Sequence, residues 1–130
     1  MQWPASQIAV AAPERVRQLR ELDKTRLWHP FTQMRDWMAP ENDPIVIERG
    51  EGAILYDCEG KTYLDGNSSI WTNVHGHNHR AINAAVEAQL GKIAHCSALG
   101  FTNEPAIKLA GQLLDLFPGD KLSRVFFSDD

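Results

Sequence analysis

Three short apolar runs joined by glycine-containing connectors constrain the fold of this chain more than any other feature. The runs occupy residues 45–48, 53–56 and 61–64. The connectors, residues 50–52 and 57–60, each contain glycine, which supplies the positive φ that a tight turn needs. Because runs this short and this close in sequence pair with their neighbours, they predict a small antiparallel meander.

Two later segments carry apolar residues at helical spacing. Residues 82–93 hold the first pattern, and Asn78 is placed to cap its N-terminus. Residues 107–117 hold the second pattern, with either Thr102 or Asn103 as its cap. The sequence therefore predicts two amphipathic helices after the meander.

The segment before the meander is less regular. Pro13 and Glu14 suit the first turn of a helix, and the apolar stripe supports that helix only as far as Asp23. Residues 1–12 have the character of a tail, and prolines break up residues 27–44. One N-terminal helix followed by irregular chain is expected.

The last apolar run, Val125-Phe126-Phe127, has the pattern of a strand buried on both faces. Such a strand needs neighbours on both edges and layers above and below. The meander is a poor partner, because its own pattern is half-exposed. We therefore expect the chain to be the N-terminal part of a longer protein whose main sheet begins here.

Composition and charge restrict the class of function. The 130 residues suit about one domain, and a net charge of −4 lacks the clustered positive field that nucleic acids and anionic membranes attract. No apolar run approaches membrane-spanning length. Cys58 and Cys96 form no metal-type pair, so two reduced thiols are expected. The sequence favours a cytoplasmic protein with neither a nucleic acid nor a membrane as partner.

The polar loop of residues 64–79 follows a strand, and loops held between rigid elements are where binding and chemistry concentrate. Three alternating histidines lie in it: His75, His77 and His79. With His95 and Cys96 they could ligate a metal. The alternative is a turn in which the histidines form caps and hydrogen bonds, and Gly76 and Asn78 favour it. No cysteine pair or carboxylate completes a ligand set, so no metal is expected.

Other candidate groups have simpler explanations. Residues 28–32 and 70–71 supply aromatic surface for a substrate pocket, although the residues alone favour core packing. The carboxylates of Asp57 and Glu59 fall in a turn, where a structural role is common. The role of the last carboxylate pair, residues 129–130, depends on the chain beyond them.

A lysine amine can hold a carbonyl-containing cofactor or substrate through a Schiff base, which makes two lysines candidates for such a role. Lys61 lies beside a turn on a half-exposed strand, and Lys92 ends a helix, where a cation favours the dipole. Both are expected to be solvated.

Four segments resemble the class III (ω-amino) aminotransferases. Residues 27–34, Leu-Trp-His-Pro-Phe-Thr-Gln-Met, resemble the family's Trp-His-Pro-Tyr/Phe-Thr segment. Residues 65–71 resemble its Asp-Gly-x-Ser-Ser-x-Trp loop, and Val-His-Gly-His at residues 74–77 continues the match. Residues 124–130 resemble the strand leading into a Gly-Ser phosphate-binding turn. Together they are typical of the biotin-pathway branch, whereas the Asp-Gly loop alone suits any member.

The resemblance implies an N-terminal fragment of an α/β, fold-type I transferase that uses pyridoxal 5'-phosphate, acts on small molecules and forms a homodimer. It implies residues 1–26 as a tail and helix. Residues 27–102 would be part of the small domain, with the meander and the active-site loop. Residues 103–130 would begin the large cofactor-binding domain.

The resemblance also implies roles for single residues. The residues expected to line the substrate and donor site are Phe31, Ile70 and Trp71. The loop at Ser68 and Ser69 would lie near the cofactor, and Asp130 would lie next to it at the chain end. The Schiff-base lysine would lie beyond Asp130, so no catalytic residue is expected in this chain and the piece alone is expected to be inactive.

The implied reaction converts 8-amino-7-oxononanoate to 7,8-diaminononanoate, with S-adenosylmethionine or lysine as amino donor. Many family members have Tyr at the position of Phe31 and Trp at the position of Ile70. The smaller aromatic surface here makes lysine at least a competent donor in our interpretation. The alternatives are another class III ω-aminotransferase, acting on ornithine or γ-aminobutyrate, and a non-catalytic binding module on the same scaffold.

Overall fold

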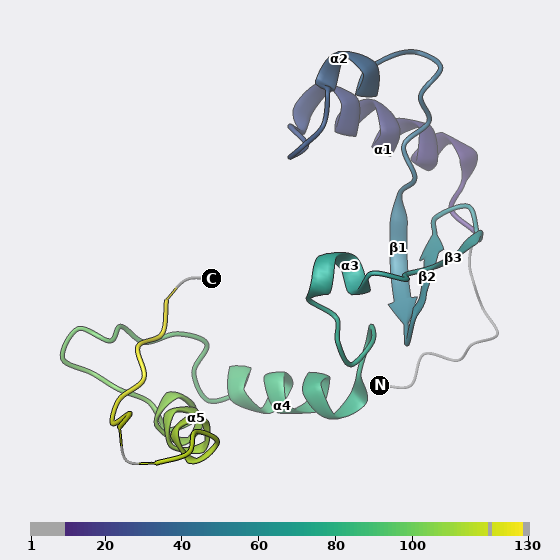
Figure 1. Cartoon of the computed structure of the whole chain (residues 1–130). Helices are drawn as coiled ribbons and strands as arrows, with labels where there is room; N and C mark the ends of the chain where they lie inside the picture. Colours follow the sequence, from purple (N-terminus) through teal and green to yellow (C-terminus); the bar gives the residue numbers. More distant parts are fainter. Residues whose placement is uncertain (1–9, 120, 129–130) are drawn as a thin grey trace. The chain divides into compact units, whose positions relative to one another are not determined.

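The computed structural model describes residues 10–119 and 121–128. Its contacts divide the chain into two units, Met1–Asn83 and Ala84–Asp130. The meander and the first helices belong to the first unit, and the last helix belongs to the second (Figure 1).

The first unit is built on an antiparallel sheet with the strand order β1-β2-β3 (Figure 1). Its strands are β1 (Ile47–Glu51), β2 (Ile54–Asp57) and β3 (Thr62–Leu64). Both pairings join strands that are consecutive in sequence. The predicted meander is confirmed.

Strand β1 begins at Ile47 and not at residue 45 as the apolar run predicted. The register shifts between Ile47 and Arg49, which interrupts the regular ladder at this end. Val46 O nevertheless accepts a hydrogen bond of 2.9 Å from Cys58 N, so the chain stays attached to the sheet before the strand begins. The tight turn falls at Gly52, whose φ is +57°.

Helix α1 (Pro13–Arg26) extends beyond Asp23, where the apolar pattern ended. Lys24 and Arg26 in its last turn favour the negative end of the helix dipole, which the apolar pattern does not register. Arg20 fastens the helix to the meander through a 2.7 Å ion pair with Glu59.

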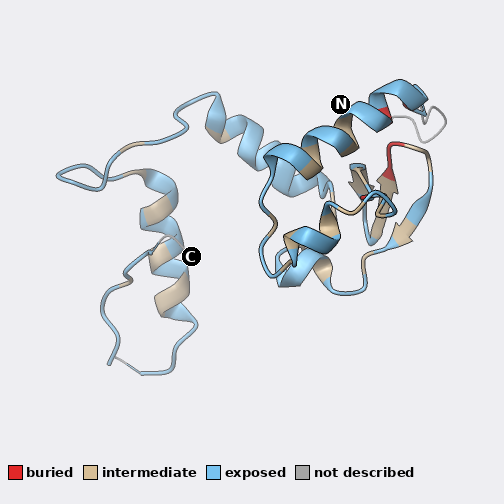
Figure 2. Ribbon diagram, turned by 90° about the horizontal axis from the view of Figure 1, so that it is seen from above, coloured by how far each residue is buried: buried red, intermediate tan, exposed pale blue. Residues whose placement is uncertain are grey.

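The hydrophobic core of the first unit is small (Figure 2). Its buried hydrophobic cluster consists of Ala11, Val16 and Cys58. Ala11 N donates a 2.9 Å hydrogen bond to Cys58 O, which ties the start of α1 to the end of β2. Polar contacts therefore position much of this unit.

The segment predicted to be irregular contains one short helix, α2 (Met34–Trp37). It lies between Pro30 and Pro40, where no proline interrupts the chain. The side chain of Gln33 accepts from Arg35 N at 3.4 Å at its N-terminus. The rest of the segment agrees with the prediction.

Helix α4 (Arg80–Leu90) confirms the first predicted helix, but the expected cap is wrong. Asn78 has a φ of +56°, whereas a capping residue has an extended backbone. Its Oδ1 accepts a 2.6 Å hydrogen bond from the side chain of Asn83. The amide of Asn78 therefore braces the loop before α4.

Helix α5 (Glu104–Asp115) confirms the second predicted helix and decides between its two candidate caps. The side chain of Asn103 accepts from Ala106 N at 3.0 Å. The backbone of Asn103 is extended, as a capping residue requires.

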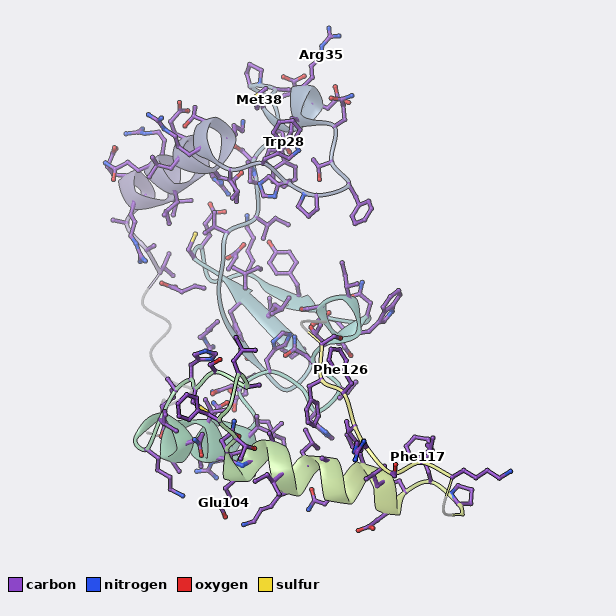
Figure 3. The ribbon with its side chains drawn as sticks, turned by 90° about the vertical axis from the view of Figure 1, so that its left-hand side faces the viewer. Trp28, Arg35, Met38, Glu104, Phe117 and Phe126 are labelled. Atoms are coloured by element: carbon purple, nitrogen blue, oxygen red, sulfur yellow. The ribbon has the colours of Figure 1, made fainter. Side chains whose placement is uncertain are left out.

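The run Val125-Phe126-Phe127 has no strand partner among the described residues, and the meander does not pair with it, as expected. Phe126, labelled in Figure 3, has an exposed side chain, with an exposed fraction of 92%. A strand requires a partner, and no strand among residues 10–119 and 121–128 pairs with this run. Residues 129–130, the second predicted carboxylate pair, lie outside the described residues.

None of the helices in the described part of the chain has both the length and the apolar character needed to cross a bilayer.

Candidate active site

His77 fastens the loop after β3 back onto the β1–β2 turn. Gly52 N donates to His77 O at 3.1 Å, and His77 N donates to Gly52 O at 2.8 Å. Gly50 leaves room for the imidazole, because a Cβ on Gly50 would stand 2.7 Å from the Cβ and Cγ of His77. Gly76, with a φ of +81°, passes close to Gly52, where a Cβ would meet the Gly52 Cα at 3.0 Å. Small residues on both sides therefore let the loop close onto the hairpin.

Asp65, at the end of β3, is the centre of the loop's hydrogen bonds. Its Oδ1 accepts from Ser69 N at 2.8 Å, and its Oδ2 accepts from Ser69 Oγ at 2.8 Å. His77 Nε2 lies 2.7 Å from the same Oδ2. Bonds from the Ser69 backbone, His77 and the Ser69 hydroxyl lower the pKa of Asp65 to about 2. The side chain of Asp65 is 5% exposed, so the carboxylate is sheltered from solvent. Its lowered pKa keeps it charged at neutral pH.

Asp65 holds an unusual turn. Helix α3 (Ser68–Trp71) has positive φ at every residue, with values of 54°, 49°, 59° and 67°. These are left-handed conformations, which cost roughly 1–2 kcal/mol per non-glycine residue. Consecutive strained residues persist only where the surroundings enforce them, and they concentrate at functional sites.

The turn presents two apolar side chains to solvent. Trp71 is 82% exposed and Ile70 is 65% exposed. Both residues are expected to line the substrate site. The structure places them next to each other on a braced turn, although core packing was favoured from the residues alone.

The two serines of the turn have different surroundings. Ser69 has both its backbone N–H and its hydroxyl committed to Asp65. Ser68 is half-buried, and its carbonyl accepts from Thr72 N at 3.1 Å and from Asn73 N at 3.0 Å. The hydroxyl of Ser69 is therefore bonded to Asp65, and Ser68 is the serine of this pair with the freer side chain.

A second carboxylate braces the segment that carries Phe31. Asp23 accepts from Trp37 Nε1 at 2.7 Å, and His29 Nε2 lies 2.9 Å from its other oxygen. The imidazole of His29 packs against the indole of Trp37, with ring centroids 4.4 Å apart. Phe31 comes two residues later, with a φ of +51° and a fully exposed ring. Each predicted substrate segment is thus braced by an aspartate with a histidine partner.

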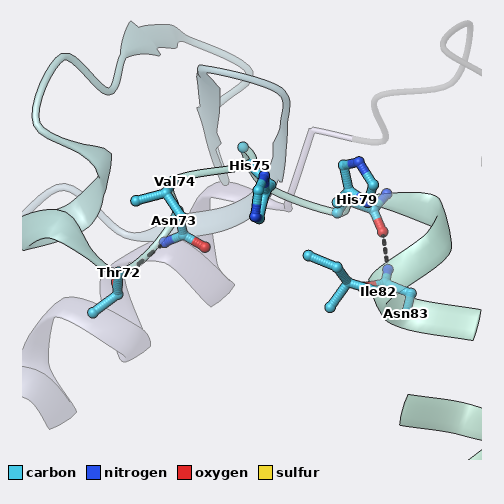
Figure 4. A pocket seen from close by; sticks show the side chains of 9 residues that line it. Thr72, Asn73, Val74, His75, His79, Ile82 and Asn83 are labelled. Carbon is cyan, nitrogen blue, oxygen red and sulfur yellow. Dashed lines mark hydrogen bonds between the residues drawn. The ribbon is translucent and has the colours of Figure 1, made fainter. Parts of the chain in front are cut away.

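The histidine triplet does not converge on one point. His77 faces Asp65, whereas His75 and His79 line a hollow of about 190 Å³ together with Ile82 (Figure 4). The rings of His75 and His79 are 5.9 Å apart between centroids. Among the described residues no three potential ligands gather as a metal would require.

The carboxylate of Asp57 is structural, as its place in a turn predicted. Asp57 accepts from Glu59 N at 2.9 Å, from Lys61 N at 2.8 Å and from Tyr63 Oη at 2.7 Å. Burial raises the pKa of Asp57, but these hydrogen bonds outweigh burial and leave the pKa below its usual value. This carboxylate holds the β2–β3 turn together.

The two lysines singled out from the sequence both lie on the surface of the protein, as expected. Lys61 is exposed and lies 3.4 Å from Glu59 Oε2, and Lys92 is exposed just after α4. Neither lysine lines the hollow beside His75 or the hollow beside Arg17 and Asp43. Phe31, Ile70 and Trp71 present exposed apolar side chains to solvent, where a small molecule could meet them.

Comparison with known proteins identifies the family. Residues 37–129 match the profile of the aminotransferase class-III family. The chain belongs to the class III aminotransferases. It is 49% identical over 112 residues to adenosylmethionine-8-amino-7-oxononanoate aminotransferase of Geobacter sulfurreducens, covering 86% of this chain and 24% of that protein. It is 54% identical over 109 residues to the protein of the same name from Anoxybacillus flavithermus, covering 84% and 23%.

Solved structures agree with this class III assignment. The adenosylmethionine-8-amino-7-oxononanoate aminotransferase of Methanocaldococcus jannaschii has a TM-score of 0.74 at 44% identity, over 78% of this chain and 23% of that one. A transaminase from the marine bacterium Virgibacillus has a TM-score of 0.71 at 36% identity, over 78% and 23%. The fold is that of fold-type I transaminases. The chain spans about a quarter of the length of the curated relatives it matches.

The sequence did not indicate the carboxylates that brace this candidate site. Asp65 opens the Asp-Gly loop motif but received no role, and Asp23 only marked the expected end of a helix. The signal for Asp65 is its place directly after a strand and just before two serines. Its link to His77 depends on the close approach of Gly50 and Gly52, which no local spacing reveals.

Proposed function

We propose that this chain is part of an enzyme that transfers an amino group to 8-amino-7-oxononanoate, giving 7,8-diaminononanoate. The observation that carries the proposal is the 49% identity over 86% of the chain to a relative that bears this activity in its name. The exposed apolar turn of Ile70 and Trp71 supports it, because the acceptor is a chain of methylene groups that needs apolar surface.

The cofactor of this proposed enzyme is pyridoxal 5'-phosphate, which supplies the electron sink for amino transfer when it is bound. The family assignment supports this proposal. The described residues contribute an apolar wall, and Lys61 and Lys92 are exposed. The lysine that holds the cofactor is therefore proposed to lie outside residues 1–130.

The amino donor is S-adenosylmethionine or lysine in this proposal. The proposed donor and substrate wall comprises Phe31, Ile70 and Trp71, with the loop at Ser68 and Ser69 and the chain end at Asp130 near the cofactor. Asp130 lies outside the described residues. The division at residues 1–26, 27–102 and 103–130 is proposed as the domain organisation, and limited proteolysis of the full-length protein checks it.

We further propose a homodimer in the cytoplasm that acts on small molecules and has neither a nucleic acid nor a membrane as partner. The net charge of −4 supports the absence of a polyanionic partner. Light scattering of the full-length protein measures its mass in solution and tests the dimer directly.

The decisive experiment is an assay of the full-length protein that carries this chain. Purified protein is mixed with pyridoxal phosphate, 8-amino-7-oxononanoate and either donor, and 7,8-diaminononanoate is quantified by mass spectrometry. Product formation is expected with at least one donor. Borohydride trapping followed by peptide mapping should place the cofactor on a lysine outside residues 1–130. Trapping at one-to-one stoichiometry on Lys61 or Lys92 would contradict the proposal.

A broader ω-aminotransferase remains the second candidate. The transaminase structures that match at 26–36% identity favour it, because the same fold segment serves other transaminases. Turnover of ornithine or γ-aminobutyrate without turnover of 8-amino-7-oxononanoate would select this candidate over the first.

A further inference from the structure

The left-handed turn of α3 requires a cause outside itself. Within the turn, Trp71 N donates to Asn67 O at 2.9 Å and Thr72 N donates to Ser68 O at 3.1 Å. A right-handed turn forms hydrogen bonds of the same spacing without the conformational cost. The local bonds therefore do not account for the hand of the turn.

The contact that distinguishes this turn is its attachment to Asp65. One carboxylate oxygen accepts from the backbone of Ser69, and the other accepts from the hydroxyl of the same residue. The two bonds fix the position and the orientation of the second residue of the turn. Asp65 is in turn anchored to the sheet, because Asp65 N donates to Ala53 O at 2.9 Å.

His77 completes the attachment from the opposite side. Its Nε2 lies 2.7 Å from Asp65 Oδ2, and its backbone is bonded in both directions to Gly52. The imidazole is mostly buried against Gly50. A continuous series of contacts therefore runs from the β1–β2 turn through His77 and Asp65 to Ser69.

We propose that Asp65 and His77 are a positioning pair that holds the left-handed turn of residues 68–71 so that Ile70 and Trp71 face the substrate. Neither member of the pair touches the substrate. Asp65 fixes the backbone of the turn, and His77 fixes the carboxylate of Asp65. The inference rests on the proposed function in one respect, namely that Ile70 and Trp71 line the substrate site.

Substitutions separate this role from general stabilisation. Asp65→Asn keeps one acceptor oxygen for Ser69 N, but its amide nitrogen cannot accept from the Ser69 hydroxyl or from His77. His77→Leu removes the partner of Asp65. His77→Gln keeps a donor where the imidazole Nε2 lies, and so serves as the conservative rescue variant.

Asp57→Asn is the matched control. Asp57 is a sheltered carboxylate of the same meander with three hydrogen bonds of its own, but these bonds go to residues 59, 61 and 63 and hold the β2–β3 turn instead of residues 68–71. The control loses a comparable set of contacts, so a general loss of stability appears in it as well.

Two measurements are made on the full-length protein with each variant. Hydrogen exchange followed by mass spectrometry reports opening of the peptide that covers residues 65–77, and it does not require activity. Steady-state kinetics with 8-amino-7-oxononanoate reports KM and kcat separately. Loss of a binding wall raises KM with kcat little changed.

The expected result has three parts. Asp65→Asn and His77→Leu speed exchange in residues 68–71 and raise KM for the acceptor about tenfold, with kcat within about threefold of wild type. His77→Gln stays near wild type in both measurements. Asp57→Asn speeds exchange around residues 57–61 and leaves the turn and KM unchanged.

Other results overturn the inference. Unchanged exchange in residues 68–71 in Asp65→Asn and His77→Leu shows that the pair does not hold the turn. Faster exchange with KM and kcat at wild-type values shows that the turn does not serve the substrate, while the proposed function stands. If the wild-type protein transfers no amino group, the proposed function fails together with the substrate part of the inference. The hydrogen-exchange measurement then decides by itself whether the pair holds the turn.

Discussion

The indole of Trp37 donates a hydrogen bond of 2.7 Å to the carboxylate of Asp23, which joins the short helix α2 to the last turns of α1. His29 binds the other oxygen of the same carboxylate at 2.9 Å. The irregular chain between these two helices is therefore held at both ends by one side chain. Phe31 lies within that held segment.

Replacing Asp23 should loosen this segment. Asp23→Ala leaves the donors of Trp37 and His29 without their acceptor, and half-buried donors without partners cost about 1–3 kcal/mol of unfolding free energy. Urea unfolding of the full-length protein measures the loss, and hydrogen exchange should quicken in residues 27–38. Glu21→Ala, an exposed carboxylate on the same helix, is the control and should change neither quantity. Equal effects of both substitutions would contradict the assignment.

Gly50→Ala tests the space around His77. The new Cβ would stand 2.7 Å from two side-chain carbon atoms of His77, so the imidazole must move away from Asp65. Overpacking of this kind costs about 1–3 kcal/mol, and exchange of residues 65–77 should quicken. Gly66→Ala is the matched control, because a Cβ there meets nothing within 4 Å. A Gly50→Ala protein with wild-type stability and exchange would show that the imidazole shifts without consequence.

Acid should weaken the loop through Asp65. Because the pKa of Asp65 is lowered from 3.8 to about 2, its bonds stabilise the folded protein fully above the unfolded value and are lost as pH falls through about 2. The difference in unfolding free energy between wild type and Asp65→Asn should therefore be constant above about pH 5 and shrink between 3.8 and 2. Urea unfolding of both proteins across this range measures it. A difference that stays constant down to pH 2 would show that Asp65 is not the titrating group.

The cap of α5 gives a paired comparison. Asn103→Ala removes the acceptor for Ala106 N and should lower the unfolding free energy by about 1 kcal/mol. Thr102→Ala, at the other candidate position, should be close to neutral. Unfolding measured on both variants decides the assignment, and the reverse order of effects would refute it.

The donor preference depends on positions 31 and 70. S-adenosylmethionine carries a sulfonium cation, and a cation over an aromatic face gains about 0.5–2 kcal/mol. Ile70→Trp should therefore raise kcat/KM for S-adenosylmethionine by about 2- to 30-fold and leave that for lysine unchanged or lower. Leu64→Trp adds the same indole at an exposed site on β3 and serves as control. If wild type turns over with S-adenosylmethionine alone, the interpretation of Phe31 and Ile70 is wrong.

The meander and the helices could be predicted from the sequence because their signals are local. Glycine connectors determined the strand pairing, and the spacing of residues 107–117 with Asn103 determined α5. The strand expected at residues 125–127 stays a prediction, because its signal is not local in the same way. An apolar run signals burial, but a strand also needs a partner, and the described residues supply none.

The substrate role of the candidate site residues stays a prediction. The resemblance indicated Phe31, Ile70 and Trp71, and these residues are exposed on held segments. It could not indicate how those segments are held, because the contact between Asp65 and His77 joins residues twelve positions apart. The left-handed conformation of α3 could not be predicted from the sequence either, since Ser, Ile and Trp have no preference for positive φ.

The left-handed turn places stability and function in opposition at the same positions. Glycine adopts positive φ without a steric penalty, so glycine at position 70 would relieve the backbone while removing the side chain that the turn displays. A variant library of this protein selected for thermal resistance alone should accumulate glycine or asparagine in residues 68–71 and lose turnover as it does so. Engineering of this enzyme for durability should therefore leave these positions fixed and gain stability elsewhere.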